Sequence, residues 1–140
     1  MKQVENCIFC RIAAGTIPSF KVFEDEWMVA FLDINPLAEG HLLVVPKDHY
    51  RRLEEVPGEE LSALARHLPR LSRAVVQATN AEGYNVLQNN GACAGQAVEH
   101  LHIHIIPRVA GDGLGYRWNA TKYAAGRDKA VHEKLLSLLK

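Results

Sequence analysis

Three histidines at alternate positions are the strongest chemical signal in this chain, in the sequence His100-Leu101-His102-Ile103-His104. Successive side chains of a β-strand point to opposite faces, so a strand here would place the imidazoles on one face, about 6.6 Å apart. Leu101 and Ile103 would then point into a core on the other face. Three imidazoles in a row are hard to explain by packing alone. The pattern predicts either a metal site or a nucleophilic histidine with neighbouring helper groups.

A loop of small and polar residues comes directly before the histidines, with the sequence Asn89-Asn90-Gly91-Ala92-Cys93-Ala94-Gly95-Gln96. Loops of this kind can present backbone N–H groups to an anion. On its own the Asn-Gly pair indicates only a turn. Next to three histidines, the loop becomes a candidate phosphate-binding segment.

A second chemical signal is the pair of cysteines Cys7 and Cys10, which are separated by two residues. A zinc ion needs four nitrogen or sulfur ligands, so the pair is half of a set that histidines could complete. A redox pair is less favoured, because no strand precedes the helix as it does in thioredoxin-like sites. The remaining alternative is two small thiols that pack a helix against a sheet. The spacing alone leaves these alternatives open.

The composition is that of an ordinary globular domain, with 48% hydrophobic and 23% charged residues in 140. Sixteen basic and sixteen acidic side chains give no net charge, so we expect no nucleic-acid polymer as a partner. The longest apolar run, residues 27–32, is far shorter than the roughly 20 residues that span a bilayer, so we expect no membrane association. Three cysteines, an odd number, argue against a secreted disulfide scaffold. We therefore expect a cytoplasmic protein.

Hydrophobic periodicity predicts five strands, over residues 20–23, 27–33, 41–45, 84–88 and 100–106. The third and fifth of these are each followed by a proline, at Pro46 and Pro107, which is expected to end the strand.

Helices are predicted over residues 6–14, 58–80 and 128–139, with Asn6 as the N-cap of the first. Pro69 should kink the long 58–80 helix or split it in two. Strands joined by turns, with one long helical crossover, indicate an α+β fold, an antiparallel five-stranded sheet with helices on one side. The length predicts one domain, residues 1–110, with a C-terminal loop and helix, residues 111–140, packed on it.

The segment His100–Ile106 resembles the signature of the histidine triad (HIT) superfamily of nucleotide hydrolases and transferases. The resemblance implies the HIT-like fold and covers nearly the whole chain from Cys7 to about Arg108, most closely the compact Hint-like branch in its zinc-containing Cys-x-x-Cys form. Its other matching segments are Ile8-Phe9-Cys10-Arg11-Ile12, Phe31-Leu32-Asp33-Ile34, residues 40–49 from Gly40 to His49, Asn89-Asn90-Gly91 and Gly95-Gln96.

The resemblance implies a role for each member of the triad. His102 matches the nucleophile that attacks the α-phosphorus of a nucleotide and becomes transiently nucleotidylated. His104 matches the histidine beside the phosphate, and Gln96 a polar group at the scissile bond. The resemblance also implies a structural zinc ion, with the ligands Cys7, Cys10, His49 and His100.

The resemblance also implies a nucleotide pocket. Asp33 matches the ribose-binding acid, with Ile34 beside it. The residues that match the surroundings of the phosphate are Asn89, Gly95, Gln96, Ala97, His102 and His104. The residues that match the apolar base pocket are Ile8, Phe9, Ile12, Phe31 and Leu43. One departure concerns the position after Gly-Gln, where such proteins often carry a small hydroxyl residue. Here it is Ala97, which cannot donate a proton to a leaving group.

Together the residues and the resemblance predict a nucleotide phosphoramidase, hydrolase or nucleotidyl transferase. It would act at the α-phosphate of a purine, AMP-like nucleotide through a nucleotidyl-histidine intermediate. The resemblance also implies a homodimer whose sheets join across the interface. One alternative is a nucleotide-binding interaction protein with little turnover. Another is a metallohydrolase in which the three histidines hold a catalytic zinc ion.

Overall fold

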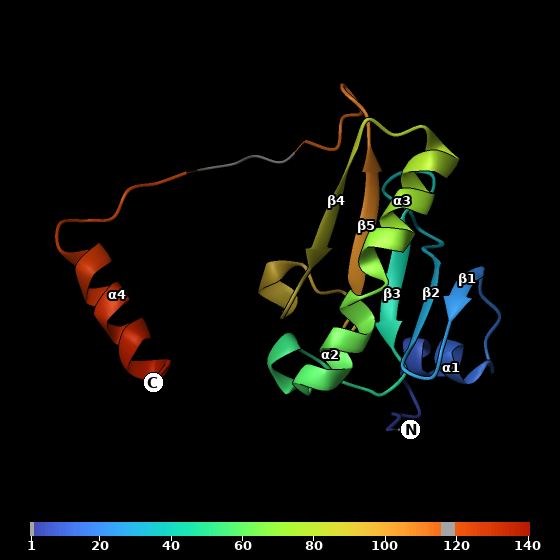
Figure 1. Ribbon diagram of the computed structural model, residues 1–140, viewed down its shortest axis with the longest axis horizontal. Coiled ribbons are helices and arrows are strands. Elements are labelled where there is room, and N and C mark those ends of the chain that lie inside the picture. The colour runs from blue at the N-terminus through green and yellow to red at the C-terminus, as the bar shows by residue number, and fades with distance from the viewer. Residues whose placement is uncertain (1, 116–119) are drawn as a thin grey trace.

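The computed structural model, which describes residues 2–115 and 120–140, contains a five-stranded antiparallel sheet (Figure 1). The strand order is β1-β2-β3-β5-β4, so β5 lies inside the sheet and β4 at one edge. This confirms the predicted fold class. The strand bounds are β1 Lys21–Glu24, β2 Met28–Leu32, β3 Leu42–Pro46, β4 Gly83–Gln88 and β5 Ile103–Arg108.

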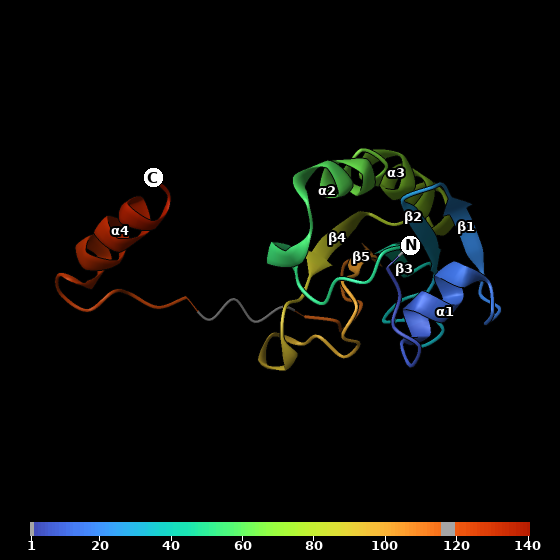
Figure 2. The same ribbon diagram turned by 90° about the horizontal axis from the view of Figure 1, so that it is seen from below.

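Helices cover both faces of the sheet. Helices α2 (Gly58–Ala65) and α3 (Leu68–Thr79) lie on one face, and α1 (Ile8–Ala14) lies on the other (Figure 2). The prediction of helices on one side was wrong. The reason is that strands β2 and β3 are apolar on both of their faces, so each face needs a cover.

The break predicted at Pro69 is confirmed, because the long helical segment is two helices. Helix α2 ends at Ala65, and Pro69 lies in the first turn of α3. A proline is tolerated there, since the first N–H groups of a helix have no partner within it. Leu64 and Leu71, on either side of the break, both pack into the same core against the sheet.

Two prolines lie inside strands rather than after them. Pro46 pairs with Met28 at the end of β3, and Pro107 pairs with Tyr84 within β5. The register of β3 along β5 stops at Ile105, so Pro107 has a neighbouring strand on one side only. A missing N–H is tolerated there, since only one ladder is present. The regular strand begins at Ile103, so the first two histidines of the triad precede it.

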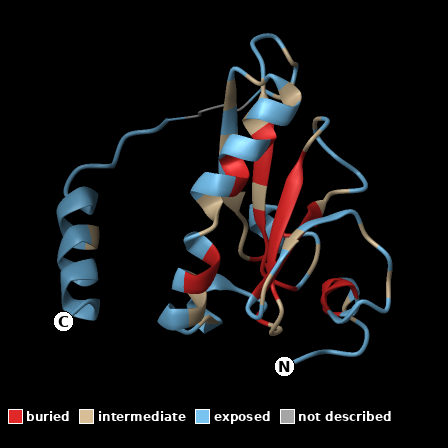
Figure 3. Cartoon of the chain, turned by 45° about the vertical axis from the view of Figure 1, so that its right-hand side comes forward, coloured by how far each residue is buried: buried red, intermediate tan, exposed pale blue. Residues whose placement is uncertain are grey.

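Short 3₁₀ turns follow β3 and β4, over Leu53–Glu55 and Ala92–Ala94, and the last helix is α4 (Arg127–Leu138). Residues 111–140 were expected to pack on the domain, and residues 116–119 of this segment lie outside the described residues. The structure instead places α4 apart from it, and every residue of α4 is exposed except the half-buried Val131 (Figures 1 and 3). Among the described helices, none combines the length and apolar character that crossing a bilayer requires.

Candidate active site and metal centre

The segment that leads into β5 sends its side chains alternately to the two faces of the sheet. Leu101, Ile103 and Ile105 enter the core under α2 and α3. His102 and His104 point to the α1 face, where their ring centroids lie 4.8 Å apart. The predicted alternation is therefore present, although only part of it lies in regular strand. The reactive side chains of the segment therefore lie on the α1 face of the sheet, and the apolar side chains that anchor it lie on the opposite face.

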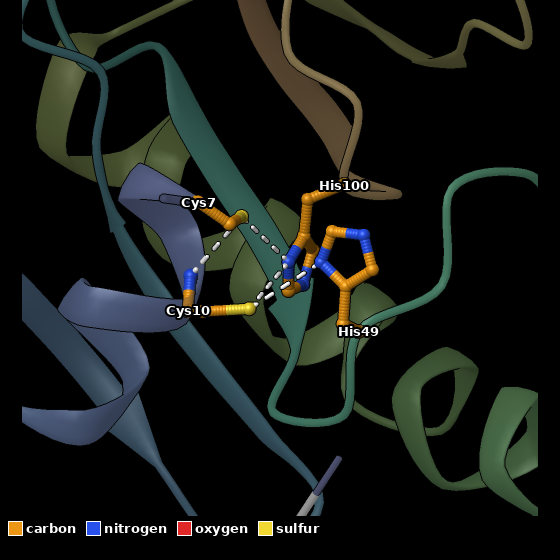
Figure 4. A group of neighbouring side chains, drawn as sticks. All are labelled: Cys7, Cys10, His49 and His100. Carbon is orange, nitrogen blue, oxygen red and sulfur yellow. Dashed lines mark hydrogen bonds between the residues drawn. The ribbon is translucent and has the colours of Figure 1, made fainter. Parts of the chain in front are cut away.

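A metal-binding group forms at one end of this row from residues far apart in the sequence: Cys7, Cys10, His49 and His100 (Figure 4). Their ligand atoms all lie within 4.8 Å of one another. The Sγ atom of Cys7 is 3.3 Å from His100 Nδ1, and the Sγ atom of Cys10 is 3.3 Å from His49 Nδ1 and 3.5 Å from His100 Nδ1. These four residues can hold a metal ion.

Local structure aims the four side chains at one point. Cys7, rather than the predicted Asn6, is the N-cap of α1, and its Sγ atom accepts the backbone N–H of Cys10 at 3.4 Å. The same turn therefore orients both thiols. A backbone hydrogen bond from Leu101 to Tyr50 O, 2.6 Å long, holds the loop of His49 beside His100.

Hydrogen bonding decides which nitrogen of His100 faces the cysteines. Its Nε2 lies 2.8 Å from the carbonyl oxygen of Pro46, which can only accept, so Nε2 carries the proton. The lone pair of Nδ1 is then directed at the thiols. Burial lowers the pKa of His100 to about 4 and raises the pKa of the Cys10 thiol to about 11. A neutral imidazole is a competent metal ligand, and a bound cation would favour the thiolate that burial disfavours.

The next histidine presents its other nitrogen. His102 is 5% exposed, and its Nδ1 lies 2.7 Å from the carbonyl oxygen of His100, so Nδ1 carries the proton. Its Nε2 is therefore the atom with the free lone pair. Burial lowers the pKa of His102, which keeps the ring neutral near pH 7. Phe9 packs edge-on against this ring at a centroid distance of 5.1 Å.

Two hydrogen bonds in series determine which nitrogen of His104 carries its proton. The backbone N–H of Leu37 donates to His41 Nδ1 at 3.1 Å, so the proton of His41 lies on Nε2. That Nε2–H donates to His104 Nδ1 at 2.9 Å, and the remaining proton of His104 must be on its Nε2. Burial lowers the pKa of His104 to about 4. The arrangement gives a nucleophilic nitrogen on one ring and a neutral hydrogen-bond donor on the next.

These rings form part of the wall of a pocket of about 390 Å³ between α1, β2, β3 and the loop before β5. Its wall includes eleven residues predicted from the sequence to bind a nucleotide: Ile8, Phe9, Ile12, Phe31, Asp33, Ile34, Leu43, Gly95, Ala97, His102 and His104. One end of the pocket is apolar, and the other carries the imidazoles and a carboxylate. An aliphatic slot with this polar end suits a ligand that has a flat apolar part and an anionic part.

Comparison with known proteins identifies the family. The model of the HIT domain family matches residues 14–111, most of the chain. The chain belongs to the HIT family. It is 43% identical over 128 residues to the adenylylsulfatase HINT3 of Arabidopsis thaliana, covering 91% of this chain but only 65%, less than two thirds, of that protein. It is 42% identical over 140 residues to the adenosine 5'-monophosphoramidase HNT1 of Candida albicans, covering 96% and 92% of the two chains.

Several solved structures share the fold. The crystal structure of SMU.412c from Streptococcus mutans superposes with a TM-score of 0.93 at 38% identity, covering 99% of this chain and 88% of that one. A HIT family protein from Bacillus anthracis gives a TM-score of 0.90 at 36% identity, covering 99% and 100%. A Zn-bound histidine triad protein from Mycobacterium smegmatis gives 0.73 at 34% identity, covering 96% and 98%.

In this HIT domain the two carboxylate oxygens of Asp33 have different surroundings: one lies in a turn, and the other faces the pocket. One oxygen, Oδ1, accepts the backbone N–H of Asn35 at 2.9 Å. The other, Oδ2, lies 3.8 Å from His41 Nε2. Asp33 lines the pocket with a half-buried side chain, so Asp33 has both a local turn contact and an oxygen available to a ligand.

A second histidine and acid group, Asp33, His41 and His104, is also close enough to suggest a metal site. Its hydrogen bonds argue against one. The N–H of Leu37 occupies the Nδ1 lone pair of His41, so its Nε2 keeps a proton and cannot be a ligand. His41 is instead a hydrogen-bond partner that sets the proton of His104.

Two residues of the predicted phosphate site lie outside the pocket. The side chain of Gln96 accepts the N–H of Gly91 at 2.7 Å and donates to Arg51 O at 2.7 Å, so both ends of its amide hold the loop. Asn89 lies on an adjacent hollow next to His104, and its Nδ2 donates weakly to Gly95 O at 3.4 Å. In this structure Gln96 is placed to shape the loop rather than to contact a phosphate.

Sequence reasoning missed six residues of the pocket wall, namely Ile17, Pro18, Ser19, Leu32, Asn35 and Val98. Most extend segments that had been recognised and could have been found as neighbours of predicted residues. Ser19 is different, because its Oγ atom is buried and forms no hydrogen bond with the described residues. An isolated serine after Ile-Pro carries no sequence signal for this position.

Proposed function

We propose that this HIT protein hydrolyses nucleotide phosphoramidates or phosphoanhydrides at the α-phosphate of a purine, AMP-like nucleotide, with His102 as the nucleophile. The observation that carries this is the proton arrangement. His102 is neutral, with a free lone pair on Nε2, and the adjacent His104 can donate from its own Nε2. The names of two relatives, an adenosine 5'-monophosphoramidase and an adenylylsulfatase, support cleavage next to an adenylyl group.

The histidines support a two-step displacement at phosphorus. His102 Nε2 forms a bond to phosphorus as the bond to the leaving group breaks, and the leaving group takes the electron pair. The ring becomes a cation, which the carbonyl oxygen of His100 stabilises through its hydrogen bond to Nδ1. His104 Nε2–H stabilises charge on the phosphoryl oxygens. Water oxygen then forms a bond to phosphorus as the P–N bond breaks; its electron pair returns to His102 Nε2, which restores the neutral ring, and the proton that the water loses passes to solvent.

The pocket supports binding of the nucleoside next to these groups. The aliphatic and aromatic walls, including Ile12 and Phe31, would hold the face of a purine. The Oδ2 atom of Asp33 would accept hydrogen bonds from the ribose hydroxyl groups. Gln96 and Asn89 would act through the loop that they hold, by presenting backbone N–H groups to the phosphate.

The metal that best fits the cysteine and histidine cluster is zinc. A tetrahedral zinc ion places sulfur and nitrogen ligands about 3.5 Å apart, from bonds of about 2.3 and 2.05 Å. The sulfur–nitrogen separations of 3.3 to 3.5 Å in the cluster match this. All four positions would be filled by protein, which leaves no open position for catalysis. Zinc would therefore tie α1 to the sheet, and the Zn-bound Mycobacterium smegmatis relative supports the choice of metal.

A homodimer is the assembly that we favour for this protein. β4 is an edge strand, and its Tyr84 and Val86 are 47% and 46% exposed. An edge with exposed apolar side chains is normally covered in a native protein. Pairing of two β4 strands would continue the sheet across the interface. Free thiols that serve as metal ligands need a reducing compartment, which favours the cytoplasm.

The test is a panel of adenylylated substrates. Purified protein is incubated with an adenosine 5'-phosphoramidate, with adenylyl sulfate and with a diadenosine polyphosphate, and AMP release is measured by chromatography. We expect AMP from at least one of them, and none in a matched His102→Ala protein. A protein that binds AMP but releases none from any substrate would instead be a nucleotide-binding interaction protein.

The leaving-group preference can be tested at Ala97. This residue lines the pocket but has no hydroxyl to protonate a departing amine. Amines leave poorly without a proton, whereas sulfate and phosphate leave as stable anions. We expect Ala97→Ser to raise the rate with the phosphoramidate relative to the rate with adenylyl sulfate. An unchanged ratio would show that a hydroxyl at this position does not reach the leaving group.

A further inference from the structure

The two cysteines of the metal cluster differ in how far solvent reaches them. Cys7 is half-buried and lies in the wall of an open hollow of about 510 Å³, together with His49 and Arg51. Cys10 does not line this hollow, and only 2% of its surface is exposed. A small molecule that enters the hollow therefore meets the sulfur atom of Cys7 before it can meet that of Cys10.

The surroundings of Cys7 favour the reactive form of its sulfur. The backbone N–H of Cys10 donates to Cys7 Sγ at 3.4 Å. A hydrogen bond donated to sulfur stabilises a thiolate, and a metal ion held by the cluster would keep the thiol deprotonated. The thiolate is the form of cysteine that attacks oxidants. Cys7 is therefore the member of the pair that a peroxide should oxidise first.

Cys10 is close enough to form a disulfide with the oxidised Cys7. Both Sγ atoms contact Nδ1 of His100, and they belong to a group whose ligand atoms all lie within 4.8 Å of one another (Figure 4). Cys7 precedes α1 with an extended backbone, so its side chain can turn toward Cys10 without unwinding the helix. The Cys-x-x-Cys spacing is also that of disulfide oxidoreductases, whose disulfides form and break readily.

The third cysteine has no such partner. Cys93 is exposed in the turn Ala92–Ala94 and lies outside the cluster. Its oxidation would stop at a single modified thiol or would join two chains. Cys7 and Cys10 are therefore the pair of described thiols that can form a disulfide within one chain.

We propose that Cys7 and Cys10 form an oxidation-sensitive pair, which hydrogen peroxide converts to a disulfide with release of the metal ion. This rests on the proposed zinc site and adds a reaction of its ligands that is separate from hydrolysis at His102. Disulfide sulfurs carry no negative charge, so His49 and His100 would be the remaining ligands of a site that needs four. The tie that the metal makes between α1 and the sheet is then lost.

The oxidation balances with one molecule of peroxide per disulfide. The thiolate of Cys7 attacks one peroxide oxygen, the O–O bond breaks, and hydroxide leaves with the electron pair. The thiolate of Cys10 then attacks the sulfur of Cys7, and the S–S bond forms as the S–O bond breaks and a second hydroxide leaves. Each sulfur loses one electron, and each peroxide oxygen gains one.

Zinc release and mass spectrometry test this reaction. The full-length protein carries Cys93→Ser, so that only the pair can react, and the matched control carries Cys10→Ser as well. Zinc-loaded protein is treated with hydrogen peroxide, a chromogenic chelator records the released zinc, and remaining thiols are alkylated before mass analysis. We expect about one zinc ion per disulfide, and a mass lower by two hydrogen atoms that a dithiol reductant restores. The control should instead gain oxygen on Cys7.

A further variant tests the order of oxidation. Cys7→Ser/Cys93→Ser leaves the buried Cys10 as its one thiol. Peroxide should oxidise this thiol at least about tenfold more slowly than it oxidises Cys7 in the matched control, because access limits the reaction. Equal rates would remove Cys7 as the first site of attack.

Three other results would overturn the proposal. Zinc that stays bound while peroxide oxidises glutathione in the same solution would show that the cluster protects its thiols. Zinc release with sulfinic or sulfonic acids and without a disulfide would show that the two cysteines do not react as a pair. Protein that holds no zinc before oxidation would remove both the zinc site and its release, without affecting the proposed hydrolysis at His102.

Discussion

His100 and His102 are two residues apart, yet they belong to regions with different chemistry. His100 faces two thiols and a second imidazole, a group suited to a closed metal site. His102 faces a pocket and a second imidazole that can donate a hydrogen bond. Both rings are buried, and burial lowers the pKa of both. Burial and residue type therefore do not distinguish the metal ligand from the nucleophile.

The difference lies in which ring nitrogen a backbone carbonyl holds. Pro46 O accepts a hydrogen bond from the Nε2–H group of His100, which leaves Nδ1 free for a metal. The carbonyl oxygen of His100 accepts a hydrogen bond from the Nδ1–H group of His102, which leaves Nε2 free to attack phosphorus. A hydrogen-bond acceptor at one ring nitrogen sets the tautomer and the direction of an imidazole. The two regions should therefore respond independently to mutation, and this can be tested.

The largest effect is expected at the nucleophile. His102→Ala should lower AMP release by on the order of a thousandfold or more, because the covalent step is lost. Acid quenching with α-labelled substrate should trap label on the unmodified protein and not on the variant. Zinc content should be unchanged in the variant. The matched control is His132→Ala, on the exposed face of α4. Equal labelling of the two proteins would remove His102 as the nucleophile.

Mutation of the metal cluster should instead change the zinc content and the thermal stability of the protein. Cys7→Ser/Cys10→Ser should abolish binding of about one zinc per chain and lower the melting temperature. Structural zinc contributes roughly 10–16 kcal/mol of apparent binding free energy in small peptides, so its loss should be evident in folding. Metal analysis and thermal unfolding measure this, with Cys93→Ser as the control because Cys93 is exposed and outside the cluster. Unchanged zinc in the double variant would contradict the proposed ligand set.

The spacing of residues along the sequence was enough to predict the local features of the metal cluster and of the pocket histidines. The alternation of His102 and His104 and the two-residue spacing of Cys7 and Cys10 depend only on the geometry of one strand or one helical turn. The break at Pro69 was predictable for the same reason. Each is decided within a few residues, where backbone geometry is the main constraint.

Other features depend on contacts that local patterns do not contain. The Gln96 amide binds Arg51 O, 45 residues away, so its position in the loop did not reveal which groups it contacts. The position of α1 on the second face did have a signal in the sequence, because Met28–Leu32 is continuously apolar rather than alternating, as is typical of a strand buried on both faces. The helical spacing of Val131, Leu135 and Leu138 in α4 was predictable, whereas the position of α4 away from the domain was not.

A smaller effect is expected where the pocket meets the ribose. Asp33→Asn keeps the Oδ1 acceptor for Asn35 N–H, so the turn should survive, but it removes the charge on the pocket side. A charged hydrogen bond contributes about 1.5–3 kcal/mol, so KM for ribonucleotides should rise roughly tenfold to a hundredfold. The kcat should stay within a few fold, because the ribose does not change in the reaction. Unchanged KM and an unchanged preference for ribo- over 2'-deoxyribonucleotides would leave Asp33 as a turn residue only.

The smallest expected effect is on the pH dependence of folding stability. It would separate the contribution of the pocket imidazoles from that of the metal site. Burial lowers the pKa of His104 to about 4, and lowers the pKa of His41 below its usual value of 6.5. As pH falls below 6.5, these groups take up protons in the unfolded chain while the folded protein excludes them. Stability should therefore be complete above about pH 6.5 and should decrease as pH falls toward about 4. One such group contributes a slope of at most about 1.4 kcal/mol per pH unit.

Zinc ligands also take up protons in this range, so the pocket contribution needs a matched variant. His104→Asn lacks the titrating ring and leaves the four proposed ligands intact. Urea unfolding at pH 7, 6 and 5 in excess zinc should give a shallower loss of stability in the variant than in the unmodified protein, with the difference largest at pH 5. Parallel curves would mean that His104 does not contribute to the loss of stability, because it would then be protonated in the folded protein as readily as in the unfolded chain.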